Sequence, residues 1–300
     1  MGGAASTKDA LESPQGGTFN HDGTLVFFTN NKPPGSGGKT TDSVTVMRVS
    51  TPYDLRTASR VFEGGDPIID IAGGSGDSRV TLDIDFNNDG TKLFLTALTG
   101  EVFPFDLQIP YSFAFNSGMS FTADSEVDLG ARGELEFNND GTKMFVSYAQ
   151  VDATETVTRH IVTFNLSTPY DISTKTFAGD SERCVFNLDT GDQGQQLYDL
   201  EITSDGMKIL VASRRNVQNR DFDKAYVLNL TSPYDISSCT RASATNDLDH
   251  NDFQNGSLAG DRTDNNTGRS NNLVEGICLL YTSDAADDMQ CVDLGGRRII

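Results

Sequence analysis

The 300-residue sequence has no tryptophan, only three histidines and few basic residues. Its 23 lysines and arginines stand against 43 aspartates and glutamates, which gives a formal net charge of −20. Contacts with a phosphate backbone need Lys and Arg to displace counterions, so this balance argues against a nucleic-acid partner. No apolar run reaches the ~18 residues of a membrane span. The first residues also lack the charged-then-apolar pattern of a signal sequence.

Cysteine and the common catalytic motifs are equally scarce. Cys184 and Cys239 are the only cysteines before residue 278, with no CxxC pair and no metal-ligand spacing. A disulfide between them fits the sequence, but a pair of buried thiols is the favoured interpretation, and the compartment stays open. No GxSxG, HExxH or phosphate loop accompanies His21, His160 and His250, so no catalytic or metal-ligating residue is predicted. Paired carboxylates abound, and in so acidic a chain we expect them on solvated faces.

Two short motifs recur four times along the chain. One contains Asp-Gly, as in "FNNDGTKLFL" from Phe86 and "FNNDGTKMFV" from Phe137. The other contains Pro-Tyr, as in "STPYDIST" from Ser167. The Pro-Tyr pairs begin at Pro52, Pro110, Pro169 and Pro233, so successive copies are 58, 59 and 64 residues apart. A fixed period of this order indicates a propeller or an array in which no copy is a domain alone.

Each copy predicts four strands. In "HIVTFNL", Val162, Phe164 and Leu166 alternate with the intervening residues, which is the period of a strand. Similar segments precede and follow each Asp-Gly, a looser one follows Pro-Tyr, and no segment carries a helical stripe. The sequence therefore predicts an all-β fold, a β-propeller of about four four-stranded antiparallel blades. We expect the blades at residues 17–63, 79–129, 131–188 and 196–245, and the start of a fifth from residue 272 in a truncated larger ring.

Residues 278–300 share nothing with the repeats. "CLLYTS" at 278–283, then "DAAD" and, after a gap, "VDLGGRRII" at 292–300 resemble a sequencing-library adapter translated in frame. We expect residues 278–300 to be a non-native tail and residues 1–277 to hold the propeller repeats. The alternative is a natural C-terminal tail. A non-native tail would imply a fragment of a longer gene, of metagenomic origin.

The combination of "DGTKMFV" with "STPYDIST" resembles the repeat of β-propeller proteins seen in marine phage and environmental bacterial sequences. More distantly it is similar to TolB-like and WD-repeat propellers, which carry a related turn at the same place. The resemblance covers roughly residues 17–277, although the second copy, "IPYSFAF", lacks the Asp. It implies a fold but no function, because propellers host binding, scaffolding and several enzyme chemistries.

The Asp-Gly pairs predict tight hairpin turns, since both residues tolerate positive φ. They are Asp89 and Gly90, Asp140 and Gly141, and Asp205 and Gly206. A calcium loop is the alternative, because Asp85, Asn87 and Asp89 fit its opening. That loop needs a bidentate Glu at its twelfth position, where this chain has Thr96. We therefore expect no cofactor, with calcium as the weaker alternative.

The Pro-Tyr pairs predict the turn between the third and fourth strands, since Pro fixes φ and the following Asp can bond the backbone two residues on. They include Pro52 and Tyr53, Pro169 and Tyr170, and Pro233 and Tyr234. We expect each Tyr ring to pack under the neighbouring blade. A platform for stacking sugars is the alternative.

The second-to-third strand loops are long and vary between copies, at residues 30–42, 149–159 and 214–223. In an up-and-down blade they emerge at the same end as the fourth-to-first loops, so the variable loops share one face. Function concentrates on loops held by a rigid scaffold. The predicted binding residues on this long-loop face are Asn30, Asn31, Arg214, Arg215 and Asn219. The alternative for the two arginines is a loop that balances nearby acids.

The sequence thus favours a non-catalytic binding or structural propeller, as a phage structural or cell-surface protein. Its expected partner is a protein or a glycan held on the long-loop face, and its expected location is a virion or the cell exterior. One alternative is a propeller hydrolase or lyase with a carboxylate and metal site in the central channel. A pure scaffold is another. Catalysis stays open, with a non-catalytic role favoured.

Overall fold

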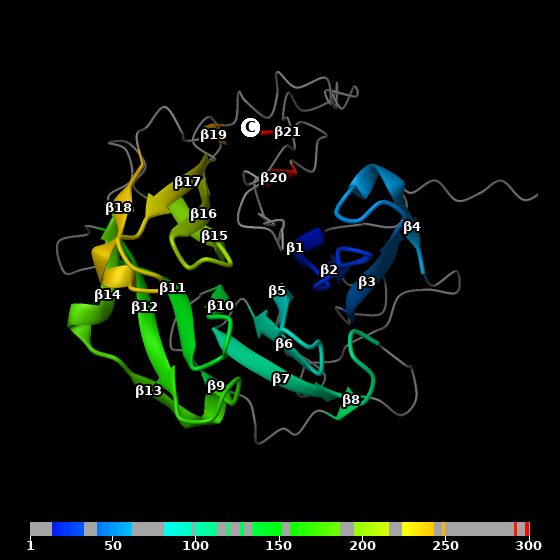
Figure 1. Ribbon diagram of the computed structural model, residues 1–300, viewed down its shortest axis with the longest axis horizontal. Coiled ribbons are helices and arrows are strands. Elements are labelled where there is room, and N and C mark those ends of the chain that lie inside the picture. Colours follow the sequence, from blue (N-terminus) through cyan, green and yellow to red (C-terminus); the bar gives the residue numbers. More distant parts are fainter. Residues whose placement is uncertain are drawn as a thin grey trace, which may run out of the picture. The chain divides into compact units, whose positions relative to one another are not determined.

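The computed structural model of the chain is built almost wholly from β-strands (Figure 1). It describes residues 14–32, 41–61, 81–97, 100–112, 119–120, 127–128, 134–151, 157–186, 195–215, 224–242, 248–249, 291–292 and 298–299. Helical structure in these ranges is confined to 3₁₀ turns of three residues each. None of these turns has the length and apolar character that crossing a bilayer requires.

The strands form four antiparallel sheets in chain order, which we call blades 1 to 4. Blade 1 contains β1 (Pro14–Phe19), β2 (Leu25–Lys32), β3 (Thr41–Val49) and β4 (Ala58–Arg60). Blade 2 contains β5 (Thr81–Phe86), β6 (Lys92–Ala97), β7 (Glu101–Leu107), β8 (Met119–Ser120) and β9 (Val127–Asp128). Each blade begins with a strand that leads into its Asp-Gly turn, as the repeat predicted.

The second half of the chain repeats the pattern. Blade 3 contains β10 (Leu135–Phe137), β11 (Lys143–Val151), β12 (Val157–Leu166), β13 (Lys175–Phe177) and β14 (Arg183–Phe186). Blade 4 contains β15 (Gln195–Ile202), β16 (Lys208–Arg215), β17 (Lys224–Asn229), β18 (Thr240–Arg241) and β19 (Leu248–Asp249). A separate pair, β20 (Cys291–Val292) and β21 (Arg298–Ile299), lies in the terminal segment. The predicted all-β propeller class with four blades is confirmed, and the expected fifth-blade start lies outside the described residues.

The fourth strand of blades 2, 3 and 4 is split into two short strands. In blade 2, β8 pairs with the end of β7 at Asp106 and Leu107, whereas β9 pairs with its beginning at Glu101 and Val102. In blades 3 and 4, β13 with β14 and β18 with β19 divide the edges of β12 and β17 in the same way. Two short edge strands explain why the sequence pattern after Pro-Tyr is weaker than in the first three strands.

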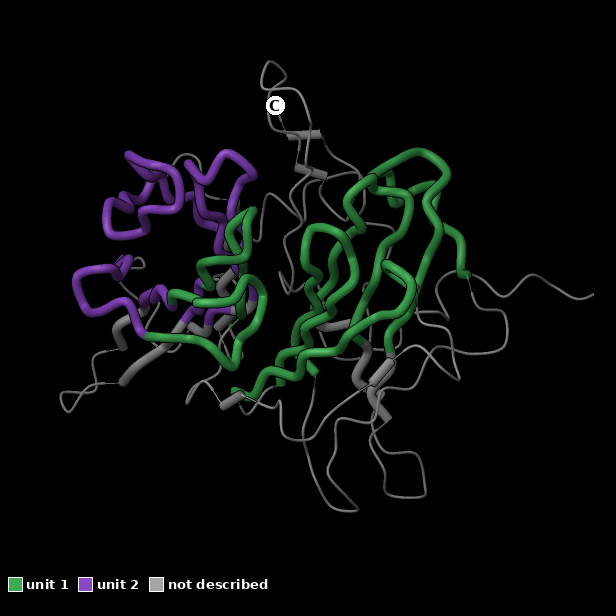
Figure 2. The backbone as a smooth tube through the Cα atoms, turned by 60° about the horizontal axis from the view of Figure 1, so that its bottom comes forward, with its two compact units in different colours: residues 1–144, 165–176 green, residues 145–164, 177–300 purple. Residues whose placement is uncertain are grey.

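The chain divides into two compact units (Figure 2). Unit 1 is residues 1–144 with 165–176, and unit 2 is residues 145–164 with 177–300. In unit 1, Phe27 and Val46 of blade 1 share a core with Leu93 and Phe103 of blade 2. All four side chains are at most 4 % exposed. The alternating strand residues of neighbouring blades thus bury each other.

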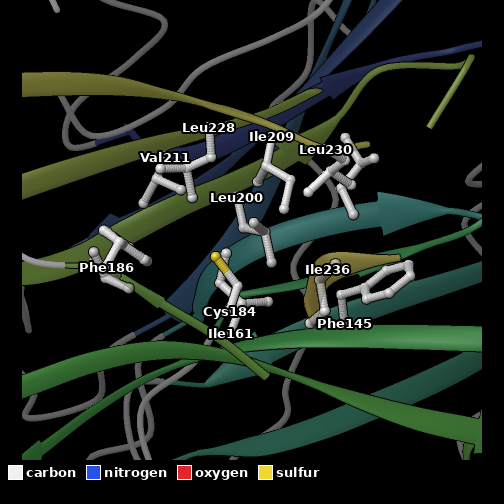
Figure 3. Packing of buried hydrophobic residues seen from close by; sticks show 12 residues of the cluster. Phe145, Ile161, Cys184, Phe186, Leu200, Ile209, Val211, Leu228, Leu230 and Ile236 are labelled. Carbon is white, nitrogen blue, oxygen red and sulfur yellow. The ribbon is translucent and has the colours of Figure 1, made fainter. Parts of the chain in front are cut away.

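The core of unit 2 joins the outer strands of blade 3 to blade 4 (Figure 3). Ile161 and Cys184 from blade 3 pack with Leu200, Ile209 and Leu228 from blade 4, and each is at most 1 % exposed. Burial of such side chains stabilises a fold by about 1.5–3 kcal/mol each. This core therefore holds two blades together as one body.

Cys184 and Cys239 form a disulfide with their Cα atoms 5.6 Å apart. Cys184 lies on β14 of blade 3, and Cys239 directly follows the 3₁₀ turn η6 (Ile236–Ser238) of blade 4. The favoured interpretation of these residues as thiols is therefore wrong. The reason is spatial, because packing of β14 against η6 brings together two cysteines that are 55 residues apart in the sequence.

Candidate functional site

The two repeated turns of each blade lie against each other. In blade 3, Tyr170 has a φ of +57° and Gly141 a φ of +68°. The Tyr170 N–H donates to the Gly141 carbonyl at 2.9 Å, and its hydroxyl donates to the Asn139 carbonyl at 3.0 Å. A Cβ placed on Gly141 would stand 2.3 Å from the tyrosine ring. We call this arrangement the Tyr-Gly clamp.

All four blades contain the clamp. The clamp pairs are Tyr53 with Gly23, Tyr111 with Gly90, Tyr170 with Gly141 and Tyr234 with Gly206. The hydroxyl donates to a carbonyl of the Asp-Gly turn in every case, at 2.6–3.0 Å. A proline directly precedes each of these tyrosines, namely Pro52, Pro110, Pro169 and Pro233. Each ring lies over the glycine of its own blade. The rings of Tyr111 and Tyr234 also stack on Phe27 and Phe145 of the preceding blade, as the sequence led us to expect.

The clamp leaves its polar groups engaged within the fold. Burial is the main cause that raises the pKa of Tyr170 to about 12, so this phenol keeps its proton and remains a donor. Asp140 accepts from the Thr142 N–H at 3.0 Å and from the Thr142 hydroxyl at 2.5 Å. These two hydrogen bonds hold the pKa of Asp140 below its usual value, and the bond from the Thr142 hydroxyl has the larger effect. Asp205 accepts in the same way from the Met207 N–H, at 2.9 Å.

The residues that fit the opening of a calcium loop have local partners as well. Asp89 accepts from Thr91, Asn87 accepts from the Lys92 N–H at 2.8 Å, and Asp85 accepts from the Phe86 N–H at 2.7 Å. Each group therefore shapes its own hairpin. Among the described residues, no three His, Cys, Asp or Glu side chains are arranged to hold a metal ion.

Neighbouring blades of unit 1 also contact each other at the end of the blade that carries the Tyr-Gly clamp. The Asn88 side-chain amide, in the Asp-Gly turn of blade 2, donates to the Asn139 carbonyl in the turn of blade 3. The ring of Tyr111 lies 5.1 Å from Phe86 of its own blade and 6.4 Å from Phe27 of blade 1. The clamp end of blade 2 therefore contributes to inter-blade packing as well as to its own turn.

Four of the predicted binding residues lie on paired strands rather than in loops. Asn30 and Asn31 belong to β2 and pair with Ser43 and Asp42 of β3. Arg214 and Arg215 belong to β16 and pair with Gln196 and Gln195 of β15. Asn219 lies outside the described residues. The loop bounds expected from sequence are too wide, because the hairpin ladders continue into polar residues.

These strand ends lie at the opposite end of each blade from the clamp. The Asp-Gly turn connects β1 to β2, and β2 then runs away from it until Lys32, where β3 begins its return. The same reasoning applies to β11 with β12 and to β16 with β17. We call this end the connection end. Both repeated motifs lie at the clamp end, so the segments that vary between copies are at the other.

A second group of residues was missed by sequence reasoning. Asp83, Glu134 and Asp199 each stand seven residues before the glycine of an Asp-Gly pair, and Gly16 takes this place in blade 1. The three acidic side chains are 8 %, 1 % and 5 % exposed. The expectation that the acidic residues lie on solvated faces is wrong for these three. The signal in the sequence is their constant distance from the turn.

Irregular strand geometry explains how these acids are buried. The pairing of β5 with β6 shifts register just before Asp83, and that of β15 with β16 shifts just before Asp199. A bulge of this kind leaves a backbone N–H outside the ladder. Asp199 accepts the Leu200 N–H at 2.8 Å, and Asp83 accepts the N–H of Ile84. The carboxyl group therefore satisfies a donor that the bulge exposes.

The acids of unit 1 are close enough to influence one another. Asp83 on β5 of blade 2 shares a hydrogen bond with Glu134, which directly precedes β10 of blade 3. Burial raises the pKa of Asp83 to about 6. Burial and then the charge of Asp83 raise the pKa of Asp85 to about 7. These groups are protonated over a pH range in which exposed carboxyls are ionised.

The histidines take no part in this cluster. The backbone carbonyl of His21 accepts the Tyr53 hydroxyl at 2.6 Å. His160 lies on β12 in unit 2, and burial, followed by the charge of Arg183, lowers its pKa. His250 lies outside the described residues. Within the described part of unit 1, the carboxyl pair therefore has no imidazole partner that the structure places beside it.

Comparison with known proteins gives structural likeness only. No family model matches the chain. No curated protein matches it either. A solved structure assigned as a 6-phosphogluconolactonase from Bacteroides uniformis is 12% identical with a TM-score of 0.44, covering 80% of this chain and 72% of its own.

Two further structures are similar at the same low level. Sqt1 from Chaetomium thermophilum, bound to the N-terminus of ribosomal protein L10, is 12% identical with a TM-score of 0.38, covering 72% of this chain. The periplasmic gluconolactonase PpgL from Pseudomonas aeruginosa is 14% identical with a TM-score of 0.40, covering 77%. This chain spans only 45% and 56% of their respective lengths. Nothing about its ligand follows from them.

Proposed function

We propose that this propeller is a non-catalytic binding or structural protein that recognises a protein or glycan through its connection end. The observation that supports this is the position of the Tyr-Gly clamps. Both repeated motifs lie at one end of each blade, where their polar groups bond to the blade itself. What varies between copies is therefore concentrated at the other end, which suits recognition of a specific partner.

The connecting segments differ from blade to blade. Residues 33–40 connect β2 to β3, residues 152–156 connect β11 to β12, and residues 216–223 connect β16 to β17. In blade 2 the connection is short, because β6 ends at Ala97 and β7 begins at Glu101. Such unequal connections on similar blades favour a shaped surface over a uniform scaffold. The strand ends that carry Asn30, Asn31, Arg214 and Arg215 would form its base.

The proposed location is a virion or the cell exterior, as part of a phage structural or cell-surface protein. The disulfide between Cys184 and Cys239 supports it, because disulfides persist in oxidising surroundings and are rare in the cytosol. The strongly acidic composition agrees with a protein that does not bind nucleic acid.

A second candidate is a hydrolase or lyase with a carboxylate and metal site. One observation favours it, the buried pair of Asp83 and Glu134 with the raised pKa of Asp83. Perturbed carboxyls of this kind are common in active sites, although buried structural acids show them as well. Hydrolase activity lost in both Asp83→Asn and Glu134→Gln would favour this candidate.

The experiment for the leading proposal replaces the segments that connect the second and third strands of the blades. Residues 33–40, 152–156 and 216–223 are each replaced by a short Gly-Ser segment in the full chain, with the paired residues of β2, β11 and β16 kept. Binding of the labelled protein to a saccharide array and to intact environmental bacterial cells is then measured. We expect binding to fall while the thermal unfolding midpoint is kept. Tyr234→Phe at the clamp end is the matched control, and loss of binding in this variant alone would contradict the proposal.

A further inference from the structure

Asp83 and Glu134 bring two carboxyl groups together in a closed interior. Asp83 lies on β5 of blade 2 and Glu134 directly precedes β10 of blade 3, and both belong to the same compact unit. At 8 % and 1 % exposure, neither is open to bulk water. A hydrogen bond between two carboxyl groups requires a proton on one of them, because an ionised carboxylate can only accept. The two side chains therefore lie close enough for one ligand to contact both.

A buried hydroxyl adds a third oxygen beside this pair. Thr96 on β6 stands directly opposite Asp83 in the β5–β6 pairing. Side chains directly opposite in an antiparallel pair have Cβ atoms about 4.5–5.5 Å apart, so this hydroxyl is within reach of the carboxyl group. Thr96 is 2 % exposed, and its Oγ1 has no hydrogen-bond partner among the described residues. A buried polar atom without a partner costs free energy, which a ligand at this point would remove.

In blade 1, the threonine at the equivalent position has hydrogen-bond partners for its hydroxyl. Thr29, six residues after Gly23 as Thr96 is after Gly90, accepts the Gly16 N–H at 3.1 Å and donates to the Leu82 carbonyl of blade 2 at 3.2 Å. This threonine position therefore faces the gap between its own first strand and that of the next blade. For Thr96, these first strands are β5, which carries Asp83, and β10, which Glu134 directly precedes.

We propose that Asp83, Glu134 and Thr96 form a binding site for one hard divalent cation such as Ca²⁺. Two carboxylates and a hydroxyl are oxygen ligands, which Ca²⁺ and Mg²⁺ prefer over nitrogen or sulfur. The cation takes the place of the proton between the carboxyl groups and gives the Thr96 hydroxyl an electrostatic partner. The site links blade 2 to blade 3, and it does not depend on the proposed connection-end partner.

Blades 1 and 4 each lack one of these ligands. In blade 1 the position of the acid is Gly16, where a Cβ would stand 2.3 Å from Asp83 Oδ1, so no fourth acid fits. In blade 4, Asp199 stands opposite Ala212, which has no hydroxyl. With only two carboxylates, the site agrees with the absence of any three-acid cluster in the described residues. Asp199 is therefore a matched control for a buried acid at the same bulge.

The test is calorimetric titration of the metal-free full chain with Ca²⁺, and separately with Mg²⁺, at pH 6.5 in two buffers of different ionisation enthalpy. We expect one ion to bind per chain with release of about one proton, because metal ligands must be deprotonated. Glu134→Gln and Thr96→Val should weaken binding by about tenfold or more. Asp199→Asn should leave it unchanged. Because Glu134→Gln and Thr96→Val remove different ligands, the test remains valid if one of these two variants folds poorly.

Exposed acids on so acidic a chain can also attract cations. The number of protons released on binding distinguishes a cation at the proposed site from cations held by exposed carboxylates. Exposed carboxylates are already ionised at pH 6.5, so ions that bind to them release no proton. Binding without proton release, or binding that Asp199→Asn weakens as much as Glu134→Gln, means an adventitious ion only and overturns the proposal. No binding of either cation at millimolar concentration overturns it as well.

Discussion

Tyr170 lies across Gly141 so closely that a single added carbon atom on the glycine would stand 2.3 Å from the ring. The backbone at both residues is left-handed, at +57° and +68°. A tyrosine in this conformation is strained, and its persistence in all four blades means that the contacts of the clamp outweigh the strain. The glycine is required both for its φ and for the space above it.

We expect Gly141→Val to lower the free energy of unfolding by about 3 kcal/mol or more, since it adds a strained β-branched residue and displaces the tyrosine ring. Urea unfolding followed by circular dichroism measures the change. Thr57→Val is the milder comparison, because it removes only a hydroxyl that donates to the Asp54 carbonyl and accepts from the Thr51 N–H, at a cost of about 1–2 kcal/mol. Equal effects of the two variants would show that the clamp has no special importance.

Tyr170→Phe removes only the hydroxyl bond to the Asn139 carbonyl and keeps the ring on Gly141. We expect a loss of about 1 kcal/mol, or up to about 3 kcal/mol if the carbonyl is left without another partner. Differential scanning calorimetry provides the measurement. A change as large as that of Gly141→Val would mean that the hydroxyl, rather than the ring, holds the two turns together.

The disulfide closes a segment of 55 residues between Cys184 and Cys239. Chain-entropy arguments give about 4 kcal/mol of stabilisation for a loop of this length. The double variant Cys184→Ala with Cys239→Ala should therefore unfold at lower urea than the oxidised chain. The reduced wild type should behave like the double variant. An unfolding midpoint that does not respond to reductant would contradict this prediction.

The raised pKa values of Asp83 and Asp85 predict how the free energy of unfolding depends on pH. The pKa values of Asp83 and Asp85, about 6 and about 7, lie above the ordinary 3.8. Between these limits the folded chain binds more protons than the unfolded chain, so the free energy of unfolding falls as pH rises from about 4 to about 7. In Asp83→Asn this fall should shrink, and the variant should be more stable at pH 8 by about 1–3 kcal/mol. Stability curves without Ca²⁺ at several pH values test both.

The acids of the Asp-Gly turns predict the opposite slope at lower pH. Bonds from Thr24 and Thr142 hold the pKa values of Asp22 and Asp140 below 3.8. Their contribution is complete above pH 3.8 and is lost as pH falls through their folded-state values. We therefore expect maximum stability near pH 4–5 in the metal-free chain. A maximum at or above pH 7 would show that the buried carboxyls are ionised without penalty.

The sequence predicted the blades well because their determinants are local. Alternation in "HIVTFNL" and the φ tolerance of Asp140 and Gly141 depend on a few adjacent residues, and β12 and its turns follow from them. Strand ends were harder, because polar residues such as Asn31 continue a ladder when the partner strand also continues. Hydrophobic pattern carries no signal there.

The candidate site was less predictable because it depends on contacts between blades. The composition of the chain gave no reason to expect Asp83 to be buried. Its burial follows from the bulge in β5 and from the approach of Glu134 from the next blade. Pairing of Cys184 with Cys239 likewise depends on β14 lying against η6. The left-handed φ of Tyr170 could not be expected, since tyrosine seldom adopts it.

The Tyr-Gly clamp closes within a single repeat, between residues such as Gly206 and Tyr234 that come from the same blade. A gene segment that encodes one repeat therefore encodes both the tyrosine and the glycine of its own clamp. Duplication or loss of such a segment leaves every remaining clamp intact, and only the surfaces between blades need to adapt. Blade number can thus change in evolution by unequal recombination without a compensating mutation in the turns, and the recurrence of Asp-Gly and Pro-Tyr in all four blades agrees with such a history.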